Sequence, residues 1–261
     1  MLVNRHLHAA ADILFPRVCA VCGTPGIDGP ELLCGPCEAT LKDLCSRAYC
    51  PTCARTVPPF AVSDGRCNQC RDGQRRTAGV VRAGPYVNSF GVILRAIKYK
   101  HRWNLAAYVG QCLAAELERS PWLESIDALV IVPPWWPRRI LAGDYAPAVL
   151  ARYVSERTGI PLIPALRRIK GGPSQIGLTA HQRIQNVRGK FSMTRGVRID
   201  EATLCLIDDV MTTGATVEEC ARTLHEAGAH AVYAAVAAHV SPGAPSVSPL
   251  GPVLEEVEVR P

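Results

Sequence analysis

Two adjacent aspartates, Asp208 and Asp209, precede a short loop of threonines and glycine. The segment 204–216 reads LCLIDDVMTTGAT. Four apolar residues come first and predict a short buried parallel strand that ends at the two acids. The loop consists of Thr212, Thr213, Gly214, Ala215 and Thr216. Backbone N–H groups and hydroxyls in such a loop, at the start of a helix, form a phosphate site, and neighbouring carboxylates accept hydrogen bonds from vicinal ribose hydroxyls.

The residues after this loop predict the helix that the site needs. Apolar residues recur at helical spacing from residue 217 to 227, and Gly228 stands where a helix ends. The simpler alternative is an ordinary turn in which Asp209 or Thr212 caps the helix. A cap accounts for one such residue, not for two acids and a run of small and hydroxylated residues together. The segment is neither a Walker loop nor a dinucleotide fingerprint, because the lysine of the first and the glycine spacing of the second are absent.

The cysteines indicate a second chemistry, which is metal binding. Of twelve cysteines, eight form four C-x-x-C pairs before residue 71: Cys19 and Cys22, Cys34 and Cys37, Cys50 and Cys53, Cys67 and Cys70. Each pair places two sulfurs on one side of a tight bend, and two pairs complete the tetrahedral thiolate set that Zn²⁺ prefers. Four protein ligands leave no position for water, so we expect two structural zinc sites. Disulfides or redox motifs are the alternative.

The pairing of these knuckles is left open by spacing alone. We expect two sequential sites, with an interleaved arrangement as the alternative. The module has few apolar residues, so metal binding should supply much of its folding energy, of order 10 kcal/mol per site. The remaining cysteines are interpreted as small buried apolar residues. They are Cys45, Cys112, Cys205 and Cys220.

Basic residues follow other predicted elements. A buried strand at 129–132 leads into a proline- and tryptophan-rich turn with Arg138 and Arg139, which suits pyrophosphate at the carboxyl edge of an open sheet. Lys98 begins a basic cluster that extends to Arg102, for which a solvated surface is the alternative. The glycine-rich segment 171–188, which includes Arg183, is interpreted as beginning with a mobile loop over the ligand.

The segment 204–216 resembles the phosphoribosyl pyrophosphate (PRPP) signature of type I phosphoribosyltransferases. From about residue 10 to residue 240 the chain resembles the ComF family, on the order of its motifs. The matching motifs are the paired knuckles, Lys98-Tyr99, QIGL at 175–178, Arg183, NVRGKF at 186–191 and DDVMTTGAT at 208–216. The resemblance implies an α/β fold: a type I phosphoribosyltransferase-like parallel sheet flanked by helices, with a small N-terminal double zinc-ribbon module. It also implies a role in natural competence and in handling incoming single-stranded DNA.

The resemblance implies roles for the site residues. Asp208 and Asp209 would be catalytic, and the ligand would be PRPP or another nucleotide, with Mg²⁺ bound mainly to PRPP oxygens. Ligand-binding residues would be Thr212, Thr213, Gly214, Ala215, Thr216, Lys98, Arg138, Arg139 and Arg183. One segment departs from the family: Gly143 to Pro147 reads GDYAP where RGFNQ is usual, so we expect slow or absent turnover. The alternative is a non-catalytic single-stranded-DNA-binding competence factor with a relic or sensor phosphoribosyl site.

We expect four regions: an N-terminal helix at 1–15, the zinc module at 16–77, the phosphoribosyltransferase-like domain at 78–240 and a mostly disordered tail at 241–261. Residues 71–77 read as a polar linker. No apolar run approaches the roughly 18 residues that span a bilayer, and no secretory signal is recognised, so we expect a cytoplasmic protein. The formal charge of +6 permits phosphate-rich ligands or nucleic acid and proves neither. The ComF resemblance implies single-stranded DNA and competence proteins as partners.

Overall fold

A five-stranded sheet forms the centre of the computed structural model, which describes residues 18–25, 32–58, 60–70, 73, 75–134, 145–171 and 179–241. The strand order is β3-β9-β8-β4-β5, and every neighbouring pair is parallel. The strands are β3 (Gly79–Pro85), β4 (Ala128–Ile131), β5 (Leu162–Ile163), β8 (Thr203–Met211) and β9 (Ala231–His239). The predicted parallel α/β architecture is therefore confirmed.

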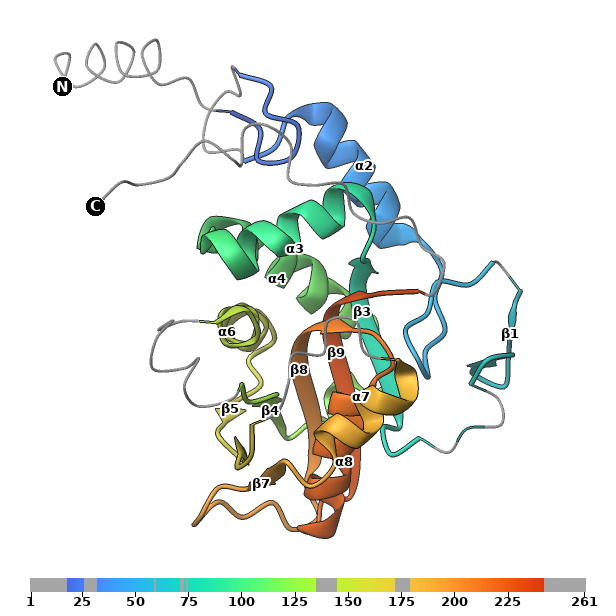
Figure 1. Ribbon diagram of the computed structural model, residues 1–261, viewed down its shortest axis with the longest axis vertical. Helices are drawn as coiled ribbons and strands as arrows, with labels where there is room; N and C mark the ends of the chain where they lie inside the picture. Colours follow the sequence, from blue (N-terminus) through green and yellow to red (C-terminus); the bar gives the residue numbers. More distant parts are fainter. Residues whose placement is uncertain are drawn as a thin grey trace, which may run out of the picture.

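Helices cover both faces of the sheet, as Figure 1 shows. They are α3 (Asn88–Lys100), α4 (Trp103–Glu118), α6 (Ala146–Thr158), α7 (Ala180–Val187) and α8 (Ala215–Glu226), with a 3-10 turn at Leu123–Ser125. Side chains of β8 alternate between the faces: Leu204 and Leu206 pack in the core with α8, whereas Cys205 and Ile207 pack in the core with α3, α4 and α6. Among the described residues, no helix is long and apolar enough to cross a bilayer.

The strand that carries the two acids is longer than the sequence indicated. Its pairing with β4 stops at Ile207, but its pairing with β9 continues to Met211. Asp208 and Asp209 therefore lie within β8, beyond the point at which β4 has ended, rather than after the strand. Helix α8 also begins earlier than predicted, at Ala215, so Ala215 and Thr216 belong to its first turn.

The zinc module contributes α2 (Gly35–Ser46) and a small hairpin of β1 (Val62–Ser63) and β2 (Arg66–Cys67). Helix α2 lies beside α3 (Figure 1). Its Leu41 and Leu44 are buried in the same core as Phe90 and Ile93 of α3. The scarcity of apolar residues in the module thus has a structural consequence: its few leucines extend the core of the α/β domain instead of forming a separate one.

The second knuckle region covers the edge strand of the sheet. The amide of Val80 in β3 donates to the carbonyl of Pro51 at 2.7 Å, and Arg82 Nη1 donates to the carbonyl of Ala54 at 2.8 Å. The Arg82 guanidinium also lies 5.1 Å from the ring of Tyr49. All residues of β3 are buried although it is an edge strand, because the zinc module covers it.

Three further expectations meet the structure only in part. Helix α7 occupies residues 180–187 of the expected loop, because Thr179 and Gln182 form a capping box that starts a helix there. Strands β6 (Leu166–Arg168) and β7 (Phe191–Met193) form an antiparallel pair on either side of this segment. The N-terminal helix at 1–15, residues 172–178 of the loop and the tail from residue 242 lie outside the described residues.

Candidate functional site

The two aspartates lie at the carboxyl edge of the sheet, beside a lysine from another element. Lys98 Nζ, in the last turn of α3, is 3.0 Å from Asp209 Oδ2. Each carboxylate also accepts a backbone amide: Asp209 N–H donates to Asp208 Oδ1 at 2.9 Å, and Val210 N–H donates to Asp209 Oδ1 at 2.8 Å. The predicted site residues Asp208, Asp209 and Lys98 are thus brought together.

Burial and charge divide the pair into two unlike acids. Burial, and secondly the charge of Asp209, raises the pKa of Asp208 well above its ordinary value. Burial also acts to raise the pKa of Asp209, but the Lys98 ammonium outweighs it and the pKa is lowered. The pKa of Lys98 is raised, chiefly by Asp209. Asp209 therefore keeps its charge, balanced by Lys98, while Asp208 holds a proton more readily.

The loop after β8 forms the start of α8. Gly214 is the N-cap residue with a left-handed φ of +79°, which glycine adopts without strain. Thr213 Oγ1 accepts the amide of Ala215 at 3.3 Å and so shapes the turn. A hollow opens between the strand end and the helix, lined by Asp208, Val210, Met211, Thr212, Thr213, Gly214, Ala215, Thr216 and Val217. A helix N-terminus beside this hollow supplies free amides and positive potential for an anion.

Two residues that the sequence analysis did not single out also lie at this loop. Arg75 Nη1 is 3.5 Å from Glu218 Oε1, and Glu218 stands in the first turn of α8. Arg75 belongs to the segment interpreted as a linker, and nothing in its sequence context marks it. An acid in a first helical turn usually indicates only a favourable interaction with the helix dipole, so Glu218 carried no special signal either.

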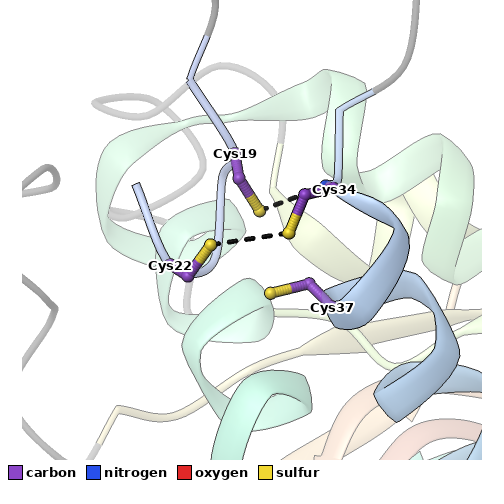
Figure 2. A group of neighbouring side chains, drawn as sticks. All are labelled: Cys19, Cys22, Cys34 and Cys37. Carbon is purple, nitrogen blue, oxygen red and sulfur yellow. Dashed lines mark hydrogen bonds between the residues drawn. The ribbon is translucent and has the colours of Figure 1, made fainter. Parts of the chain in front are cut away.

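The first four-cysteine cluster joins a loop to the start of α2. Cys19, Cys22, Cys34 and Cys37 place all four sulfurs within 4.8 Å of one another. Figure 2 shows these sulfurs pointing toward a common centre. The Sγ atoms of Cys22 and Cys34 are 3.6 Å apart, and the amide of Cys34 donates to Cys19 Sγ at 3.4 Å. The cluster therefore has the sequential pairing that we expected.

The second cluster is formed by Cys50, Cys53, Cys67 and Cys70, all of them buried. Its Sγ–Sγ distances are 3.6 Å for Cys50–Cys70, 3.7 Å for Cys53–Cys67 and 3.7 Å for Cys67–Cys70. A disulfide needs about 2.05 Å, whereas a tetrahedron with Zn–S bonds of about 2.3 Å separates its sulfurs by about 3.8 Å. Both clusters fit a structural zinc ion and exclude the interleaved pairing.

The other predicted residues have less direct relations to the acids. Arg183 lies on α7, which packs against α8. Arg138 and Arg139 lie outside the described residues. Cys205 and Cys220 are fully buried, as predicted, while Cys45 and Cys112 are only partly buried.

The fold and the cysteine clusters define a double zinc-ribbon protein with a parallel α/β domain. Residues 10–71 match the family model of the double zinc ribbon domain. The chain is similar to Competence protein F of Haemophilus influenzae, with 25% identity over 75% of this chain and 85% of the relative. It is also similar to DNA utilization protein YhgH of Escherichia coli K12, with 27% identity over 83% and 94% of the two chains. These relatives confirm the resemblance to the ComF family.

Solved structures similar to part of the chain include glutamine PRPP amidotransferase from B. subtilis complexed with ADP and GMP. That match has 25% identity and a TM-score of 0.34, over 50% of this chain and 25% of the other. A hypoxanthine phosphoribosyltransferase from Staphylococcus aureus matches with 14% identity and a TM-score of 0.31, over 50% and 61% of the two chains.

Proposed function

We propose that this protein binds PRPP or another ligand containing ribose 5-phosphate at the carboxyl edge of its sheet. One observation carries the proposal: Asp208 lines the same hollow as the turn that begins α8, and Asp209 follows it directly in β8, paired with Lys98. Phosphate and vicinal hydroxyls are the two features of a ribose 5-phosphate, and these two groups of protein atoms complement them. The two ribbons hold structural zinc and take no part in the chemistry.

Each residue has a role in this proposal. The loop from Thr212 to Thr216 holds the 5′-phosphate, and the carboxylates accept hydrogen bonds from the ribose hydroxyls. During phosphoribosyl transfer the C1–pyrophosphate bond breaks and a nitrogen nucleophile bonds to C1. The charge of Asp209 favours the oxocarbenium-like transition state of that step. Lys98, beside Asp209 at the sheet edge, can attract a pyrophosphate. The sequence offers Arg138 and Arg139 for the same role. Mg²⁺ would bind mainly PRPP oxygens and water, and the two carboxylates offer the hard oxygen donors it accepts.

Turnover is proposed to be slow or absent. In this chain the segment that departs from the ComF pattern leads into a helix: Tyr145 is the N-cap of α6, and Ala146 and Pro147 are buried in its first turn. Proline at this position starts a helix but donates no hydrogen bond to a pyrophosphate. Loss of one donor to a developing negative charge commonly costs about 10²–10³ in rate.

Calorimetry with ribose 5-phosphate tests the binding site. The double variant Asp208→Asn with Asp209→Asn should bind at least tenfold more weakly than the wild type, because amides replace both carboxyl groups proposed to accept from the ribose hydroxyls and the charge of Asp209 is lost. Asp200→Asn is a matched control, since Asp200 is an exposed acid that pairs with Arg198. Equal affinities in the wild type and the double variant would refute this placement of the site.

Release of pyrophosphate from PRPP, measured with a panel of bases, tests turnover separately. A rate of about 10 per second or more, typical of efficient enzymes, would contradict our interpretation of the Tyr145–Pro147 segment. Binding of ribose 5-phosphate with little pyrophosphate release is the expected result.

A second candidate function is binding of single-stranded DNA at the C-terminal end of α3. Tyr99 is 58% exposed there, and its neighbours Lys100, His101 and Arg102 are exposed as well. An exposed aromatic ring among cationic groups suits a single strand, because bases stack on the ring while phosphates meet the charges. This feature favours the alternative competence-factor role.

Salt titration of oligonucleotide binding tests this second function. Affinity should fall steeply between low and physiological salt, because counterions are released on binding. Tyr99→Ala should weaken binding by about 5- to 100-fold if one base stacks on the ring, whereas Tyr153→Ala, on α6, serves as the aromatic control. No binding at low salt, or binding insensitive to salt, would remove this function from consideration.

A further inference from the structure

Residues 75–77, shortly before β3, are held along α8. Glu218 of α8 accepts two hydrogen bonds from them: Arg76 N–H donates to Oε2 at 2.7 Å, and Thr77 Oγ1 donates to Oε1 at 2.8 Å. His225, two turns further along the helix, lies with Nε2 2.9 Å from the carbonyl oxygen of Arg76. Arg76 and Thr77, which the sequence suggested as the end of a linker, are therefore held against the α/β domain.

This fastening directs one guanidinium at the phosphate loop. Arg75 Nη1 is 3.5 Å from Glu218 Oε1, and its side chain is only 20% exposed. A Cβ atom built on Gly214 would lie 2.7 Å from the same Nη1. Arg75 thus lies against the N-cap of α8, close enough that a side chain at residue 214 would displace the guanidinium. Glu218 pairs with the guanidinium, which lies beside Gly214, one of the residues that line the hollow.

The surroundings of Arg75 are rich in positive charge. Within the described part of the chain, Arg55 Nε and Arg82 Nη2 are buried and have no hydrogen-bond partner. His239 pairs in register with Met211, next to the loop. Burial, followed by the charges of Arg82, Arg55 and Arg75, lowers the pKa of His239 to about 3, so this histidine stays neutral. Of these cationic side chains, Arg75 is the one that reaches the phosphate loop, where its fork of donors matches phosphate oxygens.

We propose that Arg75 is a phosphate-binding residue, supplied to the loop of the α/β domain by the segment that leaves the second zinc ribbon. The inference rests on the proposed ribose 5-phosphate site and adds a ligand to it that lies outside the 208–216 motif. It also assigns Glu218 as the residue that positions Arg75. Arg75 follows closely after Cys70 in the sequence, so we expect loss of the second zinc cluster to weaken phosphate binding.

Two neighbouring arginines provide a matched comparison. Arg75→Gln removes the guanidinium at the loop, while Arg76→Gln makes the same change one residue along, where the side chain is exposed and the backbone makes the hydrogen bonds to α8. Calorimetry with ribose 5-phosphate should show a loss of roughly 10- to 100-fold for Arg75→Gln, the range for a charge-assisted hydrogen bond. Arg76→Gln should change the affinity by less than about threefold, since its charge is exposed and screened. Arg75→Lys, which keeps the charge but not the fork, should fall between these.

The outcomes separate the inference from the function on which it rests. If the wild type binds, the Asp208/Asp209 double variant does not, and Arg75→Gln binds as well as Arg76→Gln, then Arg75 is not a ligand and the site itself stands. If the wild type does not bind ribose 5-phosphate, the proposed function and this inference both fail. Thermal unfolding of each variant detects a folding defect. If Arg75→Gln fails to fold, Arg75→Lys provides the test instead. Equal affinity of Arg75→Lys and the wild type for ribose 5-phosphate would show that the forked donors of the guanidinium are not needed.

Discussion

The shared core makes a quantitative prediction about Leu41. This residue belongs to α2 of the zinc module, yet its side chain is 0% exposed and it packs in the core that contains Phe90 and Ile93 of α3. Truncation of a fully buried leucine to alanine costs about 2–5 kcal/mol, from lost transfer free energy and the cavity left behind. A typical domain has only about 5–15 kcal/mol of stability. We therefore expect Leu41→Ala to destabilise the whole α/β domain, not the ribbon alone.

Hydrogen exchange of β8 and β9 provides the assay, because these central strands report on the α/β domain itself. Leu41→Ala should lower the protection of both strands by about the free energy lost in denaturant unfolding. Lys42→Ala is the control, as Lys42 is the exposed next residue of the same helix, and should change stability by less than about 0.5 kcal/mol. Unchanged protection of β8 and β9 in Leu41→Ala, with loss of zinc from the ribbon, would show that the module unfolds independently and would refute the shared core.

Three further predictions follow from other parts of the molecule. Protein purified without chelator should contain close to two zinc ions per chain by elemental analysis. Cys50→Ser should lower this number to about one and should weaken ribose 5-phosphate binding. One zinc ion per chain in the wild type would contradict the double site. Gly214→Ala should weaken that binding more than tenfold in calorimetry, because residue 214 has φ +79° and its Cβ would meet Arg75; unchanged affinity would contradict the close approach. The pKa of His239, about 3 in the folded protein and about 6.5 unfolded, implies that acidification favours the unfolded state. Between pH 7 and pH 5 this histidine should lower the free energy of unfolding by about 2 kcal/mol. Denaturant titrations of His239→Gln should therefore show a smaller loss of stability over this pH range than those of the wild type. An equal loss in the two proteins would argue against a neutral buried histidine.

The cysteine clusters illustrate what local sequence can predict. A C-x-x-C turn defines its own geometry, so the ligand type and the fourfold coordination could be inferred from spacing alone. The sequential pairing could only be expected, because it depends on which turns the chain brings together. The Sγ distances of 3.6–3.7 Å resolve that question.

The acid pair shows where the prediction stopped short. The apolar run before Asp208 predicted a strand correctly, but its end depends on partners that a single strand does not reveal. Pairing with β9 carries β8 on to Met211, whereas β4 has already ended. The local sequence therefore predicts that a strand forms here, but the length of the strand depends on which strands it pairs with.

The position of Arg75 could not be predicted from the sequence either, because it also depends on tertiary contacts. Its neighbour Thr77 meets Glu218 across 141 residues of chain, and no periodicity or motif connects the two. A polar, basic segment between modules usually indicates a flexible connection. Only the hydrogen bonds of Arg76 and Thr77 to Glu218 show that these residues are held beside the first turn of α8.

The cover that the second knuckle places over β3 bears on how the protein behaves when metal is scarce. Without zinc, the Pro51 carbonyl has no reason to stay at the Val80 amide, and the apolar edge strand Gly79–Pro85 is exposed along one side. An uncovered apolar strand edge recruits strands from other chains and leads to aggregation. The ribbon therefore caps the edge of β3, and we expect zinc-free chains to associate through this strand more readily than zinc-loaded chains.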